Sequence, residues 1–216
     1  MTCSACGATA AGDARFCASC GRPLRTVDDE RRVVTVLFAD IVGFTELSAR
    51  IAPARLVSLL NDIFSRFDEL AERHGLEKIK TIGDAYMVAG GLNNEQSNYS
   101  QAITELALAM RDLLRDDFEV NSLHLQVLIG IGTGPVVAGV VGKKKFIYDL
   151  WGDTVNLASR ITSEGVPGMV HVDETTYRRL MDRFEFKEPQ IIHLKGKGNT
   201  PVYQIVGPRQ AAAALS

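Results

Sequence analysis

The hydrophobic and polar positions of the chain repeat with two different periods, and each period predicts one kind of element. Residues 32–39 are almost continuously apolar, as in a strand that is buried on both faces. From Pro53 to His74 the apolar positions recur every three or four residues, which is typical of an amphipathic helix. Proline suits the first turn of a helix, and Gly75 suits its C-terminal end. These residues therefore predict a buried strand followed by a long helix.

The rest of the chain continues this pattern. Two short apolar runs, 76–82 and 85–90, flank Gly83-Asp84 and predict a β-hairpin. The order β-α-β-β-α-β with extra C-terminal strands predicts an α+β, ferredoxin-like fold, which does not identify a function by itself. The remaining predicted elements are a helix over 98–115 with Asn98 as its cap, a strand over 124–132, a turn at Gly134-Pro135, a second strand over 136–141, a helix over 154–163, small strands and one helix between 168 and 206, and a fraying end from Gln210.

Size and composition narrow the class of protein. A chain of 216 residues with 46% apolar residues supports one medium domain with a small appendage. The net charge of −2 gives no general attraction to nucleic acid or to an anionic membrane. No apolar run approaches the ~20 residues of a membrane-spanning helix, and the N-terminus has no signal-peptide pattern. We therefore expect a soluble, cytoplasmic protein without a membrane partner.

All four cysteines lie at the start of the chain, as two Cys-x-x-Cys-Gly sequences. Cys3, Cys6, Cys17 and Cys20 could give four thiolate ligands to a tetrahedral Zn2+, with glycine after each pair to let the backbone turn. Two disulfides or four incidental thiols are the alternatives, and disulfides fit poorly with a protein lacking a secretory signal. The segment resembles zinc ribbons, and four protein ligands leave no open position, so the metal is expected to be structural.

These patterns divide the chain into four parts. We expect a zinc ribbon over 1–22, a charged linker over 23–31, a catalytic domain over 32–207 and a disordered tail over 208–216. The arginines before the domain are offset by acidic residues, so the ribbon is more suited to a regulatory protein contact than to nucleic acid.

Two aspartates carry the chemistry of the domain. Asp40 ends the first apolar run, and Asp84 lies in the Gly-Asp turn of the predicted hairpin. Carboxylates at these two places can converge if their strands are neighbours, and such a pair suits Mg2+ together with substrate phosphates. The pair therefore points to nucleotide chemistry.

Three segments share a resemblance to one family. Phe38–Thr45, Lys80–Met87 and Asp149–Arg160 resemble the signature segments of class III adenylyl and guanylyl cyclases. The resemblance spans about 33–206 and leaves out the cysteine segment. It implies that Asp40 and Asp84 hold two Mg2+ or Mn2+ ions, with the Ile41 carbonyl as a further ligand. The amides of Gly43, Phe44 and Thr45 are then placed to cradle phosphate, at the start of a helix.

The resemblance also assigns the residues that read the purine. Lysine only donates and aspartate only accepts hydrogen bonds, so Lys80 and Asp149 match N1 and N6 of adenine. Guanylyl cyclases typically carry Glu and Cys at these positions. The alternative for Lys80 is a solvated lysine paired with Glu77 or Glu95.

Asn156 and Arg160 share one helix face. The resemblance implies that Asn156 orients the ribose and Arg160 stabilises charge on the α-phosphate. Lys195 is expected to reach the triphosphate, with Lys197 as the alternative, and Asp153 is read as a cap or surface residue.

In the family, one subunit supplies the metal aspartates and its partner the remaining groups, so the resemblance implies a homodimer that makes cyclic AMP from ATP. A guanylyl cyclase and a silent nucleotide-binding domain are the alternatives.

Overall fold

A computed structural model describes residues 2–3, 6–11, 17–21, 31–92, 97–120, 123–141 and 147–209. The helices are α1 (Phe44–Arg50), α2 (Pro53–Arg73), α3 (Tyr99–Asp117), α4 (Asp153–Ser163) and α5 (Glu174–Leu180). The strands are β1 (Arg31–Ile41), β2 (Glu77–Ile82), β3 (Ala85–Gly90), β4 (Glu119–Val120), β5 (Leu123–His124), β6 (Val127–Val141), β7 (Ile147–Trp151), β8 (Val170–Val172), β9 (Phe184–Phe186), β10 (Gln190–Leu194) and β11 (Gly198–Pro208).

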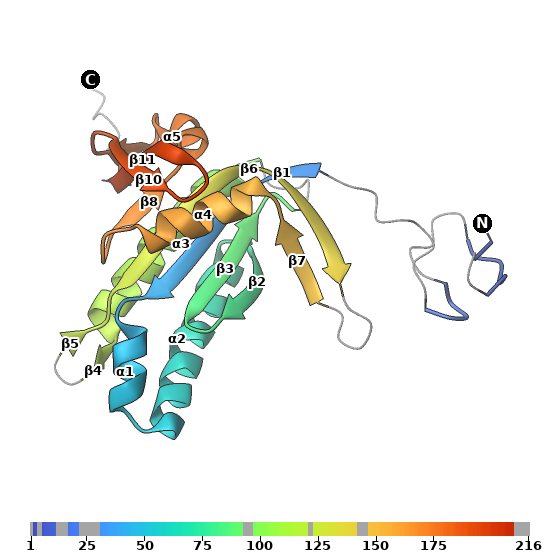
Figure 1. Cartoon of the computed structure of the whole chain (residues 1–216), viewed down its shortest axis with the longest axis horizontal. Helices are drawn as coiled ribbons and strands as arrows, with labels where there is room; N and C mark the ends of the chain where they lie inside the picture. Colours follow the sequence, from blue (N-terminus) through green and yellow to red (C-terminus); the bar gives the residue numbers. More distant parts are fainter. Residues whose placement is uncertain are drawn as a thin grey trace, which may run out of the picture.

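One large sheet organises the domain (Figure 1). Its strand order is β10-β11-β8-β6-β1-β3-β2, with β7 paired to β6 and β9 paired to β11. The four strands β6, β1, β3 and β2 pair antiparallel, whereas β8 runs parallel to β6. Together with α2 and α3 they give the predicted β-α-β-β-α-β order, so the α+β class is confirmed and the extra C-terminal strands extend one edge.

The central strand β1 is buried on both faces, as its continuous apolar run predicted. Leu37 and Ala39 belong to the larger core, which includes residues of α2 and α3. Val36 and Phe38 point the other way, into a second core that contains Ala158 of α4. Because successive side chains of a strand alternate between faces, Asp40 lies on the same face as Phe38, the one that α4 covers.

The long helix α2 follows its predicted boundaries closely. Pro53 is its first residue, and Gly75 with φ 65° follows its end. Its buried face carries Ile63 and Phe67, and the Phe67 ring meets Tyr86 of β3 edge-on at 5.5 Å between centroids. The helix therefore fixes β3, the strand that follows Asp84, against the core.

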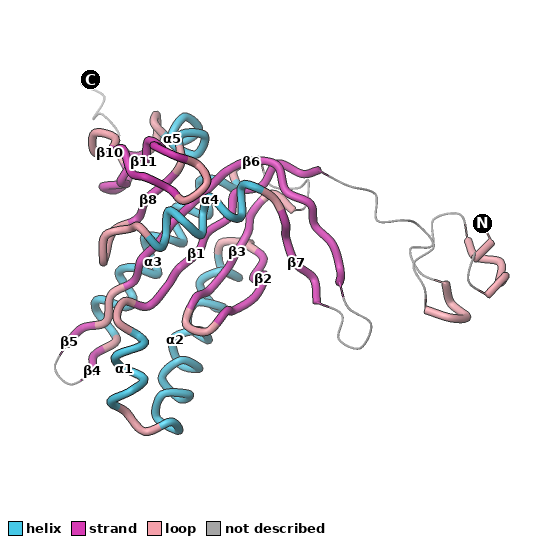
Figure 2. The backbone as a smooth tube through the Cα atoms, in the orientation of Figure 1, coloured by secondary structure: helices cyan, strands magenta, loops and turns pink. Residues whose placement is uncertain are grey.

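One predicted break in the chain is wrong. The turn expected at Gly134-Pro135 is absent, because β6 runs without interruption from Val127 to Val141 (Figure 2). Its ladder with β1 continues through Gly134 and Pro135. On the other flank of β6, pairing with β8 ends at Ile131 and pairing with β7 starts at Val137, so the proline lies where that flank has no partner strand.

The start of β6 was also placed too early. His124 belongs to the short β4–β5 pair, and β6 begins at Val127. Asn98 does precede α3, but its side chain makes no capping hydrogen bond.

Some expectations fall outside the described residues. The linker over 23–30 and the tail from Gln210 are among them, and β1 begins at Arg31, inside the range given to the linker. Within the described part of the chain, no helix is both long and apolar enough to cross a membrane.

Three glycines of β6 bring α4 against the sheet. A Cβ atom on Gly130 would lie 2.5 Å from the Thr162 nitrogen and 2.6 Å from the Ala158 oxygen, both backbone atoms of α4. Gly132 and Gly134 meet the same helix at Thr154 and Ala158. The close approach therefore depends on the absence of side chains here and sets the height of α4 above the sheet.

We expect Gly130→Ala to destabilise the domain by roughly 3 kcal/mol, because backbone atoms cannot move aside as a flexible side chain can. Gly207→Ala is the matched control, since nothing lies within 4 Å of its added Cβ. Chemical denaturation of both variants measures the difference. Equal stability of the two variants would show that the contact between α4 and β6 is not tight.

Candidate active site

Asp40 and Asp84 lie together because β1 and β3 are neighbouring strands. Asp40 pairs with Ala85 across the ladder, and Asp84 occupies the two-residue turn that joins Ile82 to Ala85. Gly83 takes a φ of 61° in this turn, which glycine adopts without strain. The two carboxyl groups are hydrogen-bonded to each other. The strand pairing therefore brings these two side chains together, as expected for neighbouring strands.

The electrostatics of the pair are unfavourable without a cation. Burial, and then the hydrogen bond and negative charge of Asp84, raise the pKa of Asp40 to about 6. The Asp40 oxygen Oδ1 is buried and has no hydrogen-bond partner within the described residues. A buried carboxylate oxygen without a donor is costly. Since Mg2+ prefers such oxygens, the pair fits a divalent metal.

The chain continues from Asp40 into the start of α1. The Ile41 backbone N–H donates to the Asp40 carboxylate, and Val42 donates to the Gln126 carbonyl at 2.9 Å. Gly43 precedes α1 with a φ of 68°, and a Cβ there would lie 3.6 Å from Oε2 of Glu46. The Glu46 carboxylate therefore lies close to Gly43, at the start of α1.

Lys80 and Asp149 form an ion pair, although 69 positions separate them. Lys80 Nζ lies 2.5 Å from Asp149 Oδ2, and the Leu150 N–H donates to Oδ1 at 2.8 Å. Both side chains are partly buried, at 30% and 15% exposed. The alternative partner Glu77 is thus not the ion-pair partner of Lys80. The pair presents a fixed donor beside a fixed acceptor.

Asn156 and Arg160 lie on α4, beside the hairpin of β10 and β11. The Arg160 guanidinium packs on the turn of this hairpin, where a Cβ at Gly196 would lie 3.6 Å from Nη1. Below the turn, Ile161 packs with Leu194 and Val202 in a small core of its own. Asn156 is exposed. The hairpin of β10 and β11 is therefore packed directly against α4.

The two lysines of the hairpin turn differ in their contacts. Lys197 forms an ion pair with Asp153, the first residue of α4. Lys195 is exposed and makes no ion pair with any other described residue. Asp153 is exposed, which confirms the surface alternative for this residue, while Gly152 is the cap of α4. The ion pair of Asp153 with Lys197 also connects the helix to the hairpin. Lys195 is therefore the lysine that can reach a bound anion.

Comparisons with known proteins agree with this geometry. The model of the adenylate and guanylate cyclase catalytic domain matches residues 27–207. An adenylate cyclase of Mycobacterium tuberculosis is 43% identical over 186 residues, which cover 86% of this chain and 42% of the relative. The chain belongs to the adenylate and guanylate cyclase family.

Solved structures of cyclase domains share the fold. The guanylate cyclase domain from Catenaria anguillulae in complex with GTP has a TM-score of 0.79 at 31% identity, covering 83% of this chain and 98% of that one. A dimeric guanylyl cyclase domain from Blastocladiella emersonii has a TM-score of 0.74 at 29% identity, covering 82% and 98%. Both nucleotide specificities therefore occur among the relatives.

The comparisons cover only part of this chain and only part of its relatives. The chain spans about two fifths of the length of the curated relatives that it matches first, at 42%. The matched residues begin at 27, so the cysteine segment lies outside the cyclase family model. A regulatory contact through that segment stays a prediction.

Within one chain the cyclase residues form three separate groups. Asp40 contacts Asp84, Lys80 contacts Asp149, and Arg160 contacts the turn that holds Lys195. Among the described residues, no hydrogen bond or ion pair joins the aspartate pair to either of the other groups. Sequence reasoning missed two contacts, Glu46 close to Gly43 at the start of α1 and Asp153 with Lys197. Only the first had a local signal, because an acidic residue is favourable in the first turn of a helix.

We expect Asp40→Asn to stabilise the metal-free protein at pH 8. Because the pKa of Asp40 is raised from 3.8 to about 6, the folded state keeps a proton that the unfolded chain releases. The free energy of unfolding therefore falls as the pH rises from about 4 to about 6, and stays low above it. After allowance for solvent screening of a partly buried group, we expect a gain of about 1 kcal/mol, or about 2–4 °C in Tm.

Thermal unfolding with a chelator present, at pH 8 and below pH 4, measures this effect. The gain should vanish at the lower pH, where Asp40 is protonated in both states. Asp62→Asn, at an exposed position of α2, is the control and should change neither value. A lower Tm for Asp40→Asn than for the wild type at pH 8 would contradict the account.

Proposed function

We propose that this cyclase domain is an adenylyl cyclase, which converts ATP into 3′,5′-cyclic AMP and pyrophosphate. The observation that carries the proposal is the ion pair of Lys80 with Asp149. Adenine offers an acceptor at N1 and a donor at N6, whereas guanine offers the reverse polarity at the same edge. Since lysine only donates and aspartate only accepts, the pair is complementary to adenine and mismatched to guanine. Buried polar groups left unpaired are what reject the wrong base.

The phosphate end of the substrate is assigned to the aspartate pair. Asp40 and Asp84, with the Ile41 carbonyl, would hold two Mg2+ or Mn2+ ions. When bound, these ions supply Lewis-acid activation of the ribose 3′-hydroxyl and neutralise charge on the triphosphate. The loop of Gly43, Phe44 and Thr45 offers its amides to the phosphates.

Helix α4 and the turn of the β10–β11 hairpin are proposed to bind the ribose and the phosphate that reacts. Asn156 orients the ribose ring, which aligns the 3′-hydroxyl with the α-phosphorus. The Arg160 guanidinium then stabilises the negative charge that grows on the α-phosphate oxygens as pyrophosphate leaves. Lys195 binds the triphosphate, because its neighbour Lys197 is already paired with Asp153.

The three groups need a second copy of the chain to meet. In the proposed homodimer, the two aspartates of one protomer face Lys80, Asp149 and helix α4 of its partner. Two equivalent sites then form across the two-fold axis. Exposed apolar side chains support association, since Ile82, Val140 and Trp151 are 53%, 46% and 40% exposed. Ile82 adjoins the Asp84 turn, and Trp151 precedes α4.

We expect the variant Lys80→Glu with Asp149→Cys to change the substrate from ATP to GTP. The change replaces the lysine, which only donates hydrogen bonds to the base, by a glutamate, which only accepts them. The ratio of kcat/KM for ATP to that for GTP should therefore fall by at least about 100-fold. Incubation with each triphosphate and Mn2+, followed by chromatography of the products, gives the ratio. Lys78→Glu is the control, because Lys78 pairs with Asp68 at 2.7 Å and should leave the preference unchanged.

The same assay separates the alternatives. Wild-type protein that forms cyclic GMP faster than cyclic AMP would be a guanylyl cyclase. Protein that forms neither product with either metal would be a silent nucleotide-binding domain. Against the latter, all six chemically specific positions are filled as the family resemblance requires: Asp40, Asp84, Lys80, Asp149, Asn156 and Arg160.

We expect Asp40→Ala and Arg160→Ala to be inactive alone and to regain activity when mixed. Half of the randomly formed dimers are mixed, and each of these holds one intact site out of two, so about a quarter of the wild-type rate should return. The cyclic AMP rate of equal mixtures measures this. Mixtures that stay inactive, while mass spectrometry shows that mixed dimers form, would rule out a shared site.

The cellular setting follows from the substrate. ATP and reduced thiols are kept in the cytoplasm, so we place the enzyme there. With a net charge of −2 the chain offers no general attraction for nucleic acid.

A further inference from the structure

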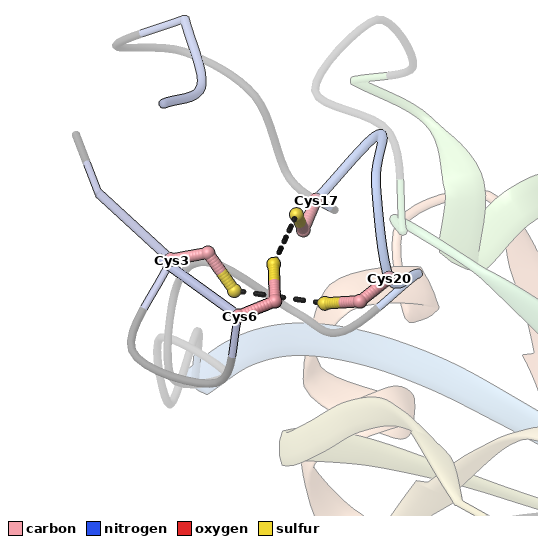
Figure 3. A group of neighbouring side chains, drawn as sticks. All are labelled: Cys3, Cys6, Cys17 and Cys20. Carbon is pink, nitrogen blue, oxygen red and sulfur yellow. Dashed lines mark hydrogen bonds between the residues drawn. The ribbon is translucent and has the colours of Figure 1, made fainter. Parts of the chain in front are cut away.

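The four cysteine sulfurs converge on one point (Figure 3). The Sγ atoms of Cys3 and Cys20 lie 3.6 Å apart, as do those of Cys6 and Cys17, and all four lie within 4.8 Å of one another. No disulfide joins them, and a disulfide needs an S–S distance of about 2.05 Å. Four sulfurs around one Zn2+, at about 2.3 Å each, lie about 3.8 Å from one another in a tetrahedron. The observed spacing matches a shared metal ion.

Two equivalent turns deliver these sulfurs. The Gly7 nitrogen donates to the Cys3 carbonyl at 2.9 Å, and the Gly21 nitrogen donates to the Cys17 carbonyl at 2.8 Å. The two glycines take nearly the same left-handed conformation, with φ of 73° and 70°. Nothing lies within 4 Å of a Cβ at either position, so a side chain would not clash there. Glycine is favoured at these positions because of the left-handed backbone conformation. Each turn therefore presents a pair of sulfurs in the same way.

The backbone also points polar hydrogens at the cluster. The N–H groups of Ser19 and Cys20 donate hydrogen bonds to the Cys17 sulfur. Amide donors of this kind favour a thiolate over a thiol, and the thiolate is the form that binds a metal.

Apolar packing among the described residues of this segment does not explain why it folds. Among the described residues from 2 to 21, only Cys3 and Cys17 are buried, and both belong to the cluster. Thiols are weak hydrogen-bond donors and acceptors, so four of them do not hold a chain together. A segment whose described residues converge on four sulfurs and bury no other side chain requires another source of folding free energy.

We propose that Cys3, Cys6, Cys17 and Cys20 bind one Zn2+ as four thiolates, and that this ion holds the segment folded. Each thiol gives its proton to solvent as it binds, so uptake of the ion releases protons. Zinc is the ion for which closed four-cysteine sites of this spacing are typical. Four protein ligands leave no position for a substrate, so the ion takes no part in cyclisation. The proposal does not depend on the function given to the carboxylate pair.

The test uses the full chain, purified without added metal. Elemental mass spectrometry should find about one zinc per chain after desalting. Replacement of zinc by Co2+ should give the absorption of cobalt in a tetrahedral thiolate site. Cys6→Ser should weaken metal retention by at least about tenfold, since even contacts outside the ligand shell are worth 10–100-fold.

Three controls keep the result specific. Ser19→Ala removes a hydroxyl but keeps the backbone N–H beside Cys17, and it should retain the metal. Asp40→Asn alters the other candidate metal site and should leave the cobalt–thiolate absorption unchanged. Gly7→Ala keeps all four ligands but strains the turn, so it should weaken retention less than Cys6→Ser. Iron in place of zinc, disulfides among the cysteines, or cobalt absorption that is lost in Asp40→Asn would each overturn the proposal.

Discussion

Two carboxyl groups that repel each other once ionised are held in contact by the pairing of β1 with β3. The strand register sets Asp40 opposite Ala85, and the turn adds Asp84 directly before it, so the backbones of the two aspartates are held side by side. The result is a pKa of about 6 for Asp40 and a buried oxygen without a donor. The fold thus carries a local cost that a bound divalent cation would remove, as expected where binding and stability compete.

The other groups that we propose for catalysis are positioned by the same sheet. The glycines of β6 let α4 lie directly on the strand that pairs with β1, and this sets the level of Asn156 and Arg160. The β10–β11 hairpin is fixed to α4 through Leu194 and the Asp153–Lys197 ion pair. The geometry of the site is therefore a consequence of backbone packing, which also positions the turns that carry Asp84 and Lys195.

Local patterns were sufficient to predict most of the elements, whereas contacts between distant residues were harder to predict. The Gly83-Asp84 turn and the ends of α2 follow from short-range rules of turn and helix chemistry. The break expected at Pro135 did not occur, because pairing with β1 decides the path of β6 and outweighs a local turn signal. The Lys80–Asp149 contact was anticipated only as a shared role, through the family resemblance. The Asp153–Lys197 contact had no sequence signal, since nothing local sets the approach of the hairpin to α4.

The central claim is that one protomer holds the metal ions and its partner reads the base. A crystal structure with Mn2+ and a non-cyclisable ATP analogue tests this most directly. The account predicts anomalous manganese peaks at Asp40 and Asp84, with the adenine edge within hydrogen-bond distance of Lys80 and Asp149 from the second copy. Manganese bound elsewhere, or a base read by the same chain that holds the metal, would contradict it.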